Sequence, residues 1–360
     1  MRRTVFAVTA LFTSLVIGAL VLEIGVLLIF GEQPKFPRRV VGAPFGLRIN
    51  EPNAVYRHKS ADVTIWFRIN SQGMRADRDF ARQKPPGLKR IVALGDSFTI
   101  GYEVANEETF SSVLERSLRA KGLNVEVINA GVSGYSNAEE CLYLERELLS
   151  YSPDLVIVSF YANDLEDNVR SGLFGLEKGE LVLTADSYVP AGGVGDFLNT
   201  NIVFNFLSGY SNAFALIKET ATLALKQRMV AENVGQVGVE AAAGGSLAEG
   251  SVAAEQRLAS AIFERILRDT RAKGIPLLIQ SIPVFAPGEQ RNELFDAFPL
   301  AEFDVHRPGV HYLSAKVVLD PYVNDQPLYW RHSHGHWTPL AQRLDGEALA
   351  DLITAEHLLD

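Results

Sequence analysis

The stretch Ile91-Val92-Ala93-Leu94-Gly95-Asp96-Ser97-Phe98 decides how the rest of the chain is interpreted. Its four leading apolar residues predict a short buried strand, and Gly95 gives the backbone room to turn. Ser97 then falls where the next helix begins, at the carboxyl end of the strand, which is where open α/β sheets place their ligand sites. A backbone N–H group at a helix start favours an anion. Ser97 therefore combines a nucleophilic hydroxyl with a backbone donor.

Strand and helix patterns alternate on both sides of this stretch. Strands are expected at residues 90–94, 125–129, 155–160 and 276–282, and helices at 110–121, 138–150, 253–273 and 339–358. The alternation predicts an α/β fold, with a parallel sheet and helices on both of its faces.

Three further motifs follow in the chain: Val127-Ile128-Asn129-Ala130-Gly131-Val132-Ser133-Gly134, Tyr161-Ala162-Asn163-Asp164 and Gly335-His336-Trp337-Thr338-Pro339. Gly95-Asp96-Ser97-Phe98 resembles block I of the SGNH (GDSL-like) hydrolases, and the three later motifs resemble blocks II, III and V. All four occur in the order of that family. The resemblance covers about residue 90 to the C-terminus, with a variable middle. It implies a flavodoxin-like three-layer fold and esterase chemistry.

The resemblance also implies a role for each motif. Ser97 would be the nucleophile, and His336 the general base, because a neutral imidazole can accept the serine proton near pH 7. The Ser97 N–H, the Gly134 N–H and the Asn163 side chain would form the oxyanion hole that stabilises the developing negative charge. Asp96 is expected to be structural, accepting backbone hydrogen bonds at the turn.

The acid of a catalytic triad is missing from its usual place. The resembled family has an aspartate two or three residues before the histidine, where this chain has Ser333 and His334. Loss of such an acid costs roughly 10⁴ in turnover in a serine protease. Three interpretations stay open. In the first, another carboxylate acts as the triad acid, and the nearest in sequence are Asp320, Asp325 and Asp345. In the second, the enzyme works as a Ser–His dyad in which His334 or a backbone carbonyl orients His336. In the third, the site is catalytically impaired.

Neither a metal nor a cofactor is expected. His332, His334 and His336 alternate and could share one side of an extended segment, but a metal there would occupy the base and no carboxylate pattern supports it. Cys141 is the only cysteine, which excludes an internal disulfide and a cysteine-based metal site. The formal net charge of −9 argues against a nucleic-acid partner.

The N-terminus predicts a single membrane-spanning helix. Residues 4–22 carry no charge, and as a helix they would extend roughly 29 Å, close to the hydrocarbon thickness of a bilayer. Glu23 would then lie near one interface. The apolar run is too long for a signal-peptide core and lacks a clear cleavage site, so an uncleaved signal anchor is favoured over a cleaved signal peptide. Because long domains translocate largely regardless of charge, the catalytic domain is expected outside the cytoplasm, in the periplasm or extracellular space.

Three regions are expected along the chain: residues 1–32 as the anchor, 33–88 as a juxtamembrane linker and small strand-rich extension, and 89–360 as the hydrolase domain. Within the last, residues 186–252 would be a variable insertion, irregular over 186–207 and a flexible Gly- and Ala-rich loop over 234–250.

The function expected from these features is that of a membrane-anchored serine esterase. Its substrate would carry an ester, with O-acetyl groups on a cell-envelope glycan the expected class by analogy. The alternatives are an O-acetyltransferase that uses the same serine, and a catalytically impaired glycan-binding module.

Overall fold

A five-stranded parallel sheet forms the centre of the protein. The computed structural model describes residues 2–33, 35, 39–188, 201–233, 247–285, 293–298, 300, 302–333 and 335–360. The strands are β5 (Lys89–Leu94), β6 (Val125–Asn129), β7 (Leu155–Tyr161), β10 (Leu277–Ile282) and β13 (Val310–Ser314), in the order β13-β10-β7-β5-β6. All four pairings are parallel. This is the doubly wound, flavodoxin-like order, which confirms the predicted fold class and adds β13 as a strand that was not predicted.

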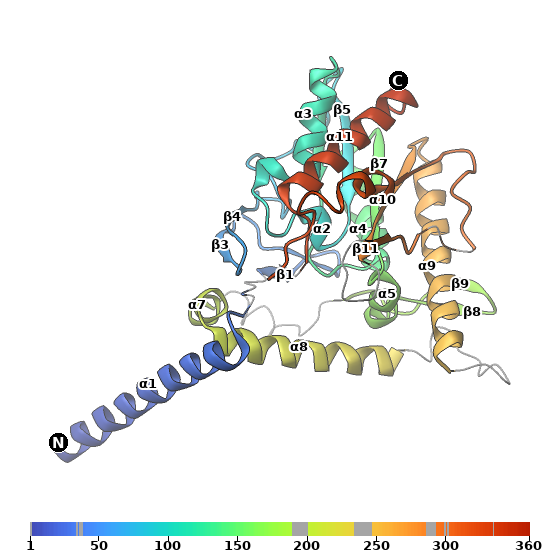
Figure 1. Ribbon diagram of the computed structural model, residues 1–360. Helices are drawn as coiled ribbons and strands as arrows, with labels where there is room; N and C mark the ends of the chain where they lie inside the picture. Colours follow the sequence, from blue (N-terminus) through green and yellow to red (C-terminus); the bar gives the residue numbers. More distant parts are fainter. Residues whose placement is uncertain are drawn as a thin grey trace.

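Alternate residues of each strand face opposite layers, as the pleat of a strand requires. In β5, Ile91 and Ala93 pack with α3 (Phe110–Ala120) and α11 (Pro339–Ala355). Val92 and Leu94 of the same strand pack with α4 (Asn137–Arg146) and α9 (Leu247–Arg271) on the other face. Figure 1 shows these helices on the two sides of the sheet. The continuous apolar run in β5 therefore reflects a strand buried on both faces.

The other elements are shorter or lie outside the sheet. They are α1 (Arg2–Phe30), β1 (Val40–Gly42), β2 (Arg48–Asn50), β3 (Val55–Lys59), β4 (Thr64–Arg68), α2 (Ser97–Ile100), η1 (Asn106–Glu108), η2 (Leu148–Tyr151), α5 (Asp164–Ser171), β8 (Phe174–Glu177), β9 (Glu180–Leu183), α7 (Ile202–Tyr210), α8 (Asn212–Asn233), β11 (Val284–Phe285), β12 (Leu294–Phe295), α10 (Ala315–Leu319) and η4 (Asp320–Tyr322).

Several expected boundaries are corrected. The helix expected over 138–150 ends at Arg146 as α4, and a 3₁₀ turn, η2, follows it. The segment expected to be irregular over 186–207 contains the start of α7, while residues 189–200 lie outside the described residues. Most of the expected loop over 234–250 also lies outside them, and residues 247–250 belong to α9. Apolar residues lie around much of the circumference of α7, so the sequence shows no clear amphipathic pattern there.

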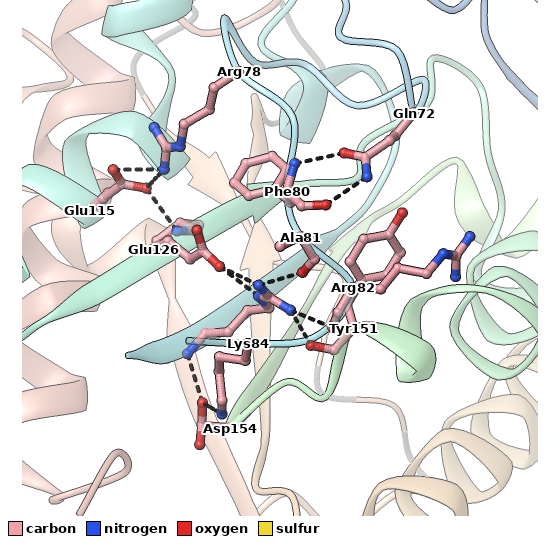
Figure 2. Close-up of polar contacts among 12 residues, drawn as sticks. Gln72, Arg78, Phe80, Ala81, Arg82, Lys84, Glu115, Glu126, Tyr151 and Asp154 are labelled. Atoms are coloured by element: carbon pink, nitrogen blue, oxygen red, sulfur yellow. Dashed lines mark hydrogen bonds and ion pairs between the residues drawn. The ribbon is translucent and has the colours of Figure 1, made fainter. Parts of the chain in front are cut away.

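The strand-rich extension packs directly on the main sheet. Figure 2 shows Phe80 and Lys84 of this extension beside the strands of the sheet, and the buried Phe80 belongs to the same core as Val92 of β5. The buried Arg90 of β5 donates to the carbonyl of Ala81 (2.8 Å) and pairs with Glu126 of β6 (2.7 Å). Arg78 pairs with Glu115 of α3 at 2.7 Å. The expected extension is therefore fastened to the main sheet and to α3 by ion pairs and hydrogen bonds.

A buried polar chain connects α11 to the middle of the sheet. The Ser159 hydroxyl of β7 donates to the side-chain Oε1 of Gln280 in β10 (2.8 Å), and the side-chain Nε2 of Gln280 donates to Asp345 of α11. Asp345 has no solvent exposure. Burial disfavours the charged carboxylate and raises the pKa of Asp345 to about 7.

This raised pKa makes stability depend on pH at Asp345. The folded state holds the Asp345 proton more tightly than the unfolded chain does. The contribution of Asp345 to the free energy of unfolding is therefore fully present below about pH 4 and is lost as the pH rises toward 7. Asp345→Asn keeps an acceptor for Gln280 and removes the charge. We expect this variant to be more stable than the parent by roughly 1–4 kcal/mol at pH 8 and nearly equal at pH 4, as measured by denaturant unfolding followed by circular dichroism. An equal difference at both pH values would contradict the pH dependence.

Candidate active site

Ser97 lies at the carboxyl end of β5, where the strand order of the sheet reverses. It is the first residue of α2, and Asp96 is the N-cap, accepting a hydrogen bond from the Phe98 N–H at 2.8 Å. Asp96 thus has the structural role expected for it. The turn also explains Gly95, since a Cβ there would lie 1.9 Å from the Thr99 Oγ1. The local geometry presents the Ser97 hydroxyl at the edge of the sheet.

His336 meets Ser97 across 239 residues of sequence. Its Nε2 lies 2.8 Å from the Ser97 Oγ. The histidine lies in the segment before α11, and its carbonyl accepts a hydrogen bond from the Trp330 N–H at 2.9 Å. The imidazole packs on the rings of Phe98 and Tyr102, with centroids 5.0 and 5.5 Å away. These contacts restrict the ring to an orientation that directs Nε2 at the hydroxyl.

A buried glutamate faces the other nitrogen of this imidazole. The Glu103 Oε2 lies 3.5 Å from the His336 Nδ1, and its Oε1 lies 3.7 Å from the Nε2 of His58 in β3. Glu103 has no solvent exposure. Although burial alone would raise its pKa, the hydrogen bonds of His336 and His58 hold the pKa of Glu103 well below the ordinary value. Glu103 is therefore an anion in the position of a triad acid.

The backbone around Glu103 is held in an unusual conformation. Glu103 has φ of 66°, in the left-handed region that few residues other than glycine adopt. The buried Arg75 donates to the carbonyls of Ile100 (2.8 Å) and Val104 (2.6 Å), on either side of Glu103. The Trp330 indole donates to the carbonyl of Glu103 itself at 3.2 Å. Such strain persists only where the surroundings fix it, and it occurs often at active sites.

The aspartates proposed from the sequence lie elsewhere. Asp345 is bonded to Gln280 inside the sheet, Asp320 pairs with Lys316, and Asp325 is exposed in a turn. Ser333 bonds to Ser60 and Asp62 of the extension, and His334 lies outside the described residues. The family pattern places the acid two or three residues before the histidine, whereas Glu103 follows Ser97 by six residues. An acidic residue inside the apolar run Ile100-Gly101-Tyr102-Glu103-Val104 is the signal that could have identified it.

The second and third motifs converge on the same edge of the sheet. The Val132 N–H donates to the Gly95 carbonyl at 3.1 Å, which places the turn that carries Gly134 beside the Ser97 turn. The Tyr161 ring lies 4.6 Å from the Phe98 ring, which brings the third motif alongside α2. All four motifs thus lie around the carboxyl ends of β5, β6 and β7.

The two predicted oxyanion donors outside Ser97 are connected by a buried ion pair. The Gly134 carbonyl accepts hydrogen bonds from Arg48 and from Arg170, the latter at 2.9 Å. Arg170 pairs with Asp167, and Asp167 accepts a hydrogen bond from the Asn163 side-chain amide at 3.2 Å. Gly134 has φ of 74°, which favours glycine. The backbone of Gly134 and the side chain of Asn163 are therefore fixed by one network.

Comparison with known proteins identifies the family of the chain. A family model described as the GDSL-like Lipase/Acylhydrolase family matches residues 93–344. An arylesterase from Vibrio mimicus is 34% identical over 76 residues, which is 21% of this chain. The matched part spans 38% of the length of that relative.

Two solved structures have a similar but distant fold. One is a lipolytic protein of the G-D-S-L family from Desulfitobacterium hafniense, at 13% identity and a TM-score of 0.37, over 73% of this chain and 99% of that one. The other is the esterase EstA from Pseudoalteromonas, at 13% identity and a TM-score of 0.38, over 75% of this chain and 98% of that one. Neither bears on the substrate.

Replacement of Glu103 tests its position as the acid. Glu103→Gln keeps the shape of the side chain and removes the charge that would stabilise an imidazolium on His336. We expect kcat for an activated aryl ester to fall by about 10²–10⁴. Asp345→Asn is the matched control, because it neutralises another buried carboxylate near the sheet, and it should keep the parent rate. The assignment would be refuted if Asp345→Asn were the impaired variant and Glu103→Gln were not.

Proposed function

Because the chain belongs to the GDSL-like lipase/acylhydrolase family, the SGNH hydrolases, whose chemistry is ester hydrolysis, we propose that it is a serine esterase with Ser97 as its nucleophile. The observation that carries this proposal is the 2.8 Å contact between the Ser97 Oγ and the His336 Nε2, with Glu103 3.5 Å from the opposite ring nitrogen. A nucleophile, a base and a group that orients the base form the constellation required for acyl transfer.

The proposed reaction proceeds through an acyl-enzyme. His336 removes the proton of Ser97 as the hydroxyl attacks the ester carbonyl, and Glu103 stabilises the resulting imidazolium. The N–H groups of Ser97 and Gly134 and the amide of Asn163 would donate to the oxyanion. His336 then returns the proton to the departing alcohol, and water, activated by the same imidazole, releases the acid and free Ser97.

We propose further that α1 is a retained membrane anchor. Its hydropathy averages 2.5 over 18 residues, and its side chains are exposed over that window. Glu23 of α1 accepts hydrogen bonds from the backbone N–H groups of Asn212 (2.6 Å) and Ala213 (3.1 Å), which begin α8. A helix start leaves such donors unsatisfied, so removal of α1 as a signal peptide would strip α8 of its cap. This contact supports an anchor that stays with the protein.

The substrate proposed for this site is an ester in the cell envelope, with O-acetyl groups on a glycan as the class. A catalytic domain outside the cytoplasm, beside the membrane, would meet such a polymer. The three proposed regions are the anchor (1–32), the extension (33–88) and the hydrolase domain (89–360). Glu103 is buried, has a strained backbone and lies 3.5 Å from His336, which in turn contacts Ser97. Because such strain occurs often at active sites, this geometry favours an active esterase over the catalytically impaired glycan-binding module.

The nucleophile and base are tested together. Ser97→Ala and His336→Ala should each remove nearly all esterase activity, and the double variant should be little worse, because residues that act as one unit are not additive. A fluorophosphonate probe should label the parent protein and fail to label Ser97→Ala. Additive losses would contradict a shared site. Release of acetate without transfer to an added saccharide would separate hydrolysis from O-acetyl transfer.

The anchor is tested by extraction of membranes at alkaline pH. Because α1 has a charge-free stretch long enough to cross a bilayer, the full-length protein should stay in the membrane pellet in sodium carbonate. Replacing Leu11 and Leu15 with lysine should release it, since a charge at the centre of a span costs about 2.5–3.5 kcal/mol each. Recovery of the parent protein in the supernatant would contradict the proposal.

A further inference from the structure

A short helix beside the anchor exposes an apolar face that the esterase site does not use. In α7 (Ile202–Tyr210), the side chains of Ile202, Val203, Phe206 and Tyr210 are 81, 61, 61 and 53% exposed. Their spacing of one, four and eight residues places all four within about 100° of one another around the helix. These four residues form what we call the α7 apolar face.

The location of this face relates it to the proposed membrane boundary. Glu23 lies at the end of the charge-free part of α1, and its carboxylate also accepts a hydrogen bond from the Ser211 hydroxyl at 2.8 Å. Ser211 directly follows Tyr210, the last residue of α7. The carboxyl end of α7 is therefore attached at the level where α1 would leave the hydrocarbon, and Figure 1 shows α7 beside the junction of α1 and α8.

The chemistry of α7 suits the headgroup region of a bilayer. Phe206 and Tyr210 stack with centroids 4.9 Å apart, and the guanidinium of Arg57 lies 5.5 Å from the Tyr210 ring. An aromatic ring with a polar end, as in Tyr210, apolar neighbours and a nearby cation are typical of helices that lie in the interface plane. A soluble domain rarely leaves four adjacent large apolar side chains in water.

We propose that α7 is a second membrane contact, lying in the headgroup region of the same bilayer that α1 spans. This inference rests on the anchor proposed above. One helix alone would let the catalytic domain rotate and swing about its exit point. Two contacts, joined by the Glu23 cap, fix the domain against the lipid surface and give the Ser97 site a constant orientation toward it.

Site-specific fluorescence in reconstituted vesicles tests this contact. In a Cys141→Ala background, single cysteines are introduced at Phe206, at Leu11 inside α1 and at Glu347 on the exposed face of α11, and each is labelled with the dye NBD. The full-length protein is reconstituted in phosphatidylcholine and phosphatidylglycerol vesicles with or without doxyl-labelled lipid. Hydrolysis of a soluble aryl ester at the parent rate shows that each variant is folded.

We expect doxyl lipid to quench the Phe206→Cys label at least half as strongly as the Leu11→Cys label and to leave the Glu347→Cys label unchanged. A Phe206→Cys label that is quenched by aqueous iodide, and by doxyl lipid no more than the Glu347→Cys label, would overturn the inference while the Leu11→Cys signal still supports the anchor. An unquenched Leu11→Cys label would refute the anchor itself. Efficient dimer cross-linking of the unlabelled Phe206→Cys variant, without lipid quenching of its labelled form, would also overturn the inference, because a second copy would then cover the face.

Discussion

The buried carboxylate of Glu103 is the group on which the arrangement of the site depends. An anion without solvent exposure is costly unless charged or hydrogen-bonding partners surround it, and Glu103 faces two imidazoles, His336 and His58. The interaction with His336 orients the imidazole whose Nε2 contacts the Ser97 hydroxyl. The interaction with His58 connects the same carboxylate to β3 of the extension. The carboxylate of Glu103 therefore connects three parts of the chain: the turn after Ser97, the segment that carries His336, and β3 of the extension.

The extension is accordingly part of the active-site scaffold. Arg75 holds the carbonyls that flank Glu103, and Arg48 contacts the carbonyl of Gly134 while pairing with Glu139 of α4 at 3.1 Å. The Asn50 side chain donates to the Gly131 carbonyl at 3.0 Å. The extension thus contacts both the acid and the turn proposed to supply an oxyanion donor. A chain cut at residue 89 would lose the contacts made by all three of these residues.

Local sequence pattern was sufficient for some of this architecture and insufficient for the rest. Strand and helix alternation predicted the parallel sheet, and four motifs predicted that Ser97 and His336 would meet. The position of Glu103 could not be derived in this way, because it depends on a left-handed residue held by Arg75 and Trp330 from distant segments. The helices α7 and α8 were missed because their apolar residues lack the one-sided pattern of a helix packed on a core. Packing of α8 on α1, and of α7 on α8 and β3, accounts for their position better than local propensity does.

The contact between Glu23 and α8 also constrains the order in which the protein assembles. The two partners are separated by 189 residues, so the cap closes a very long loop whose entropy must be overcome before the contact forms. During synthesis, Glu23 leaves the ribosome long before Asn212 exists. If α1 is the membrane anchor proposed above, it enters the bilayer before α8 is made, and α8 then folds against a helix that is already in place. The contact between Glu23 and the start of α8 therefore forms late in synthesis, after the proposed anchor has left the ribosome.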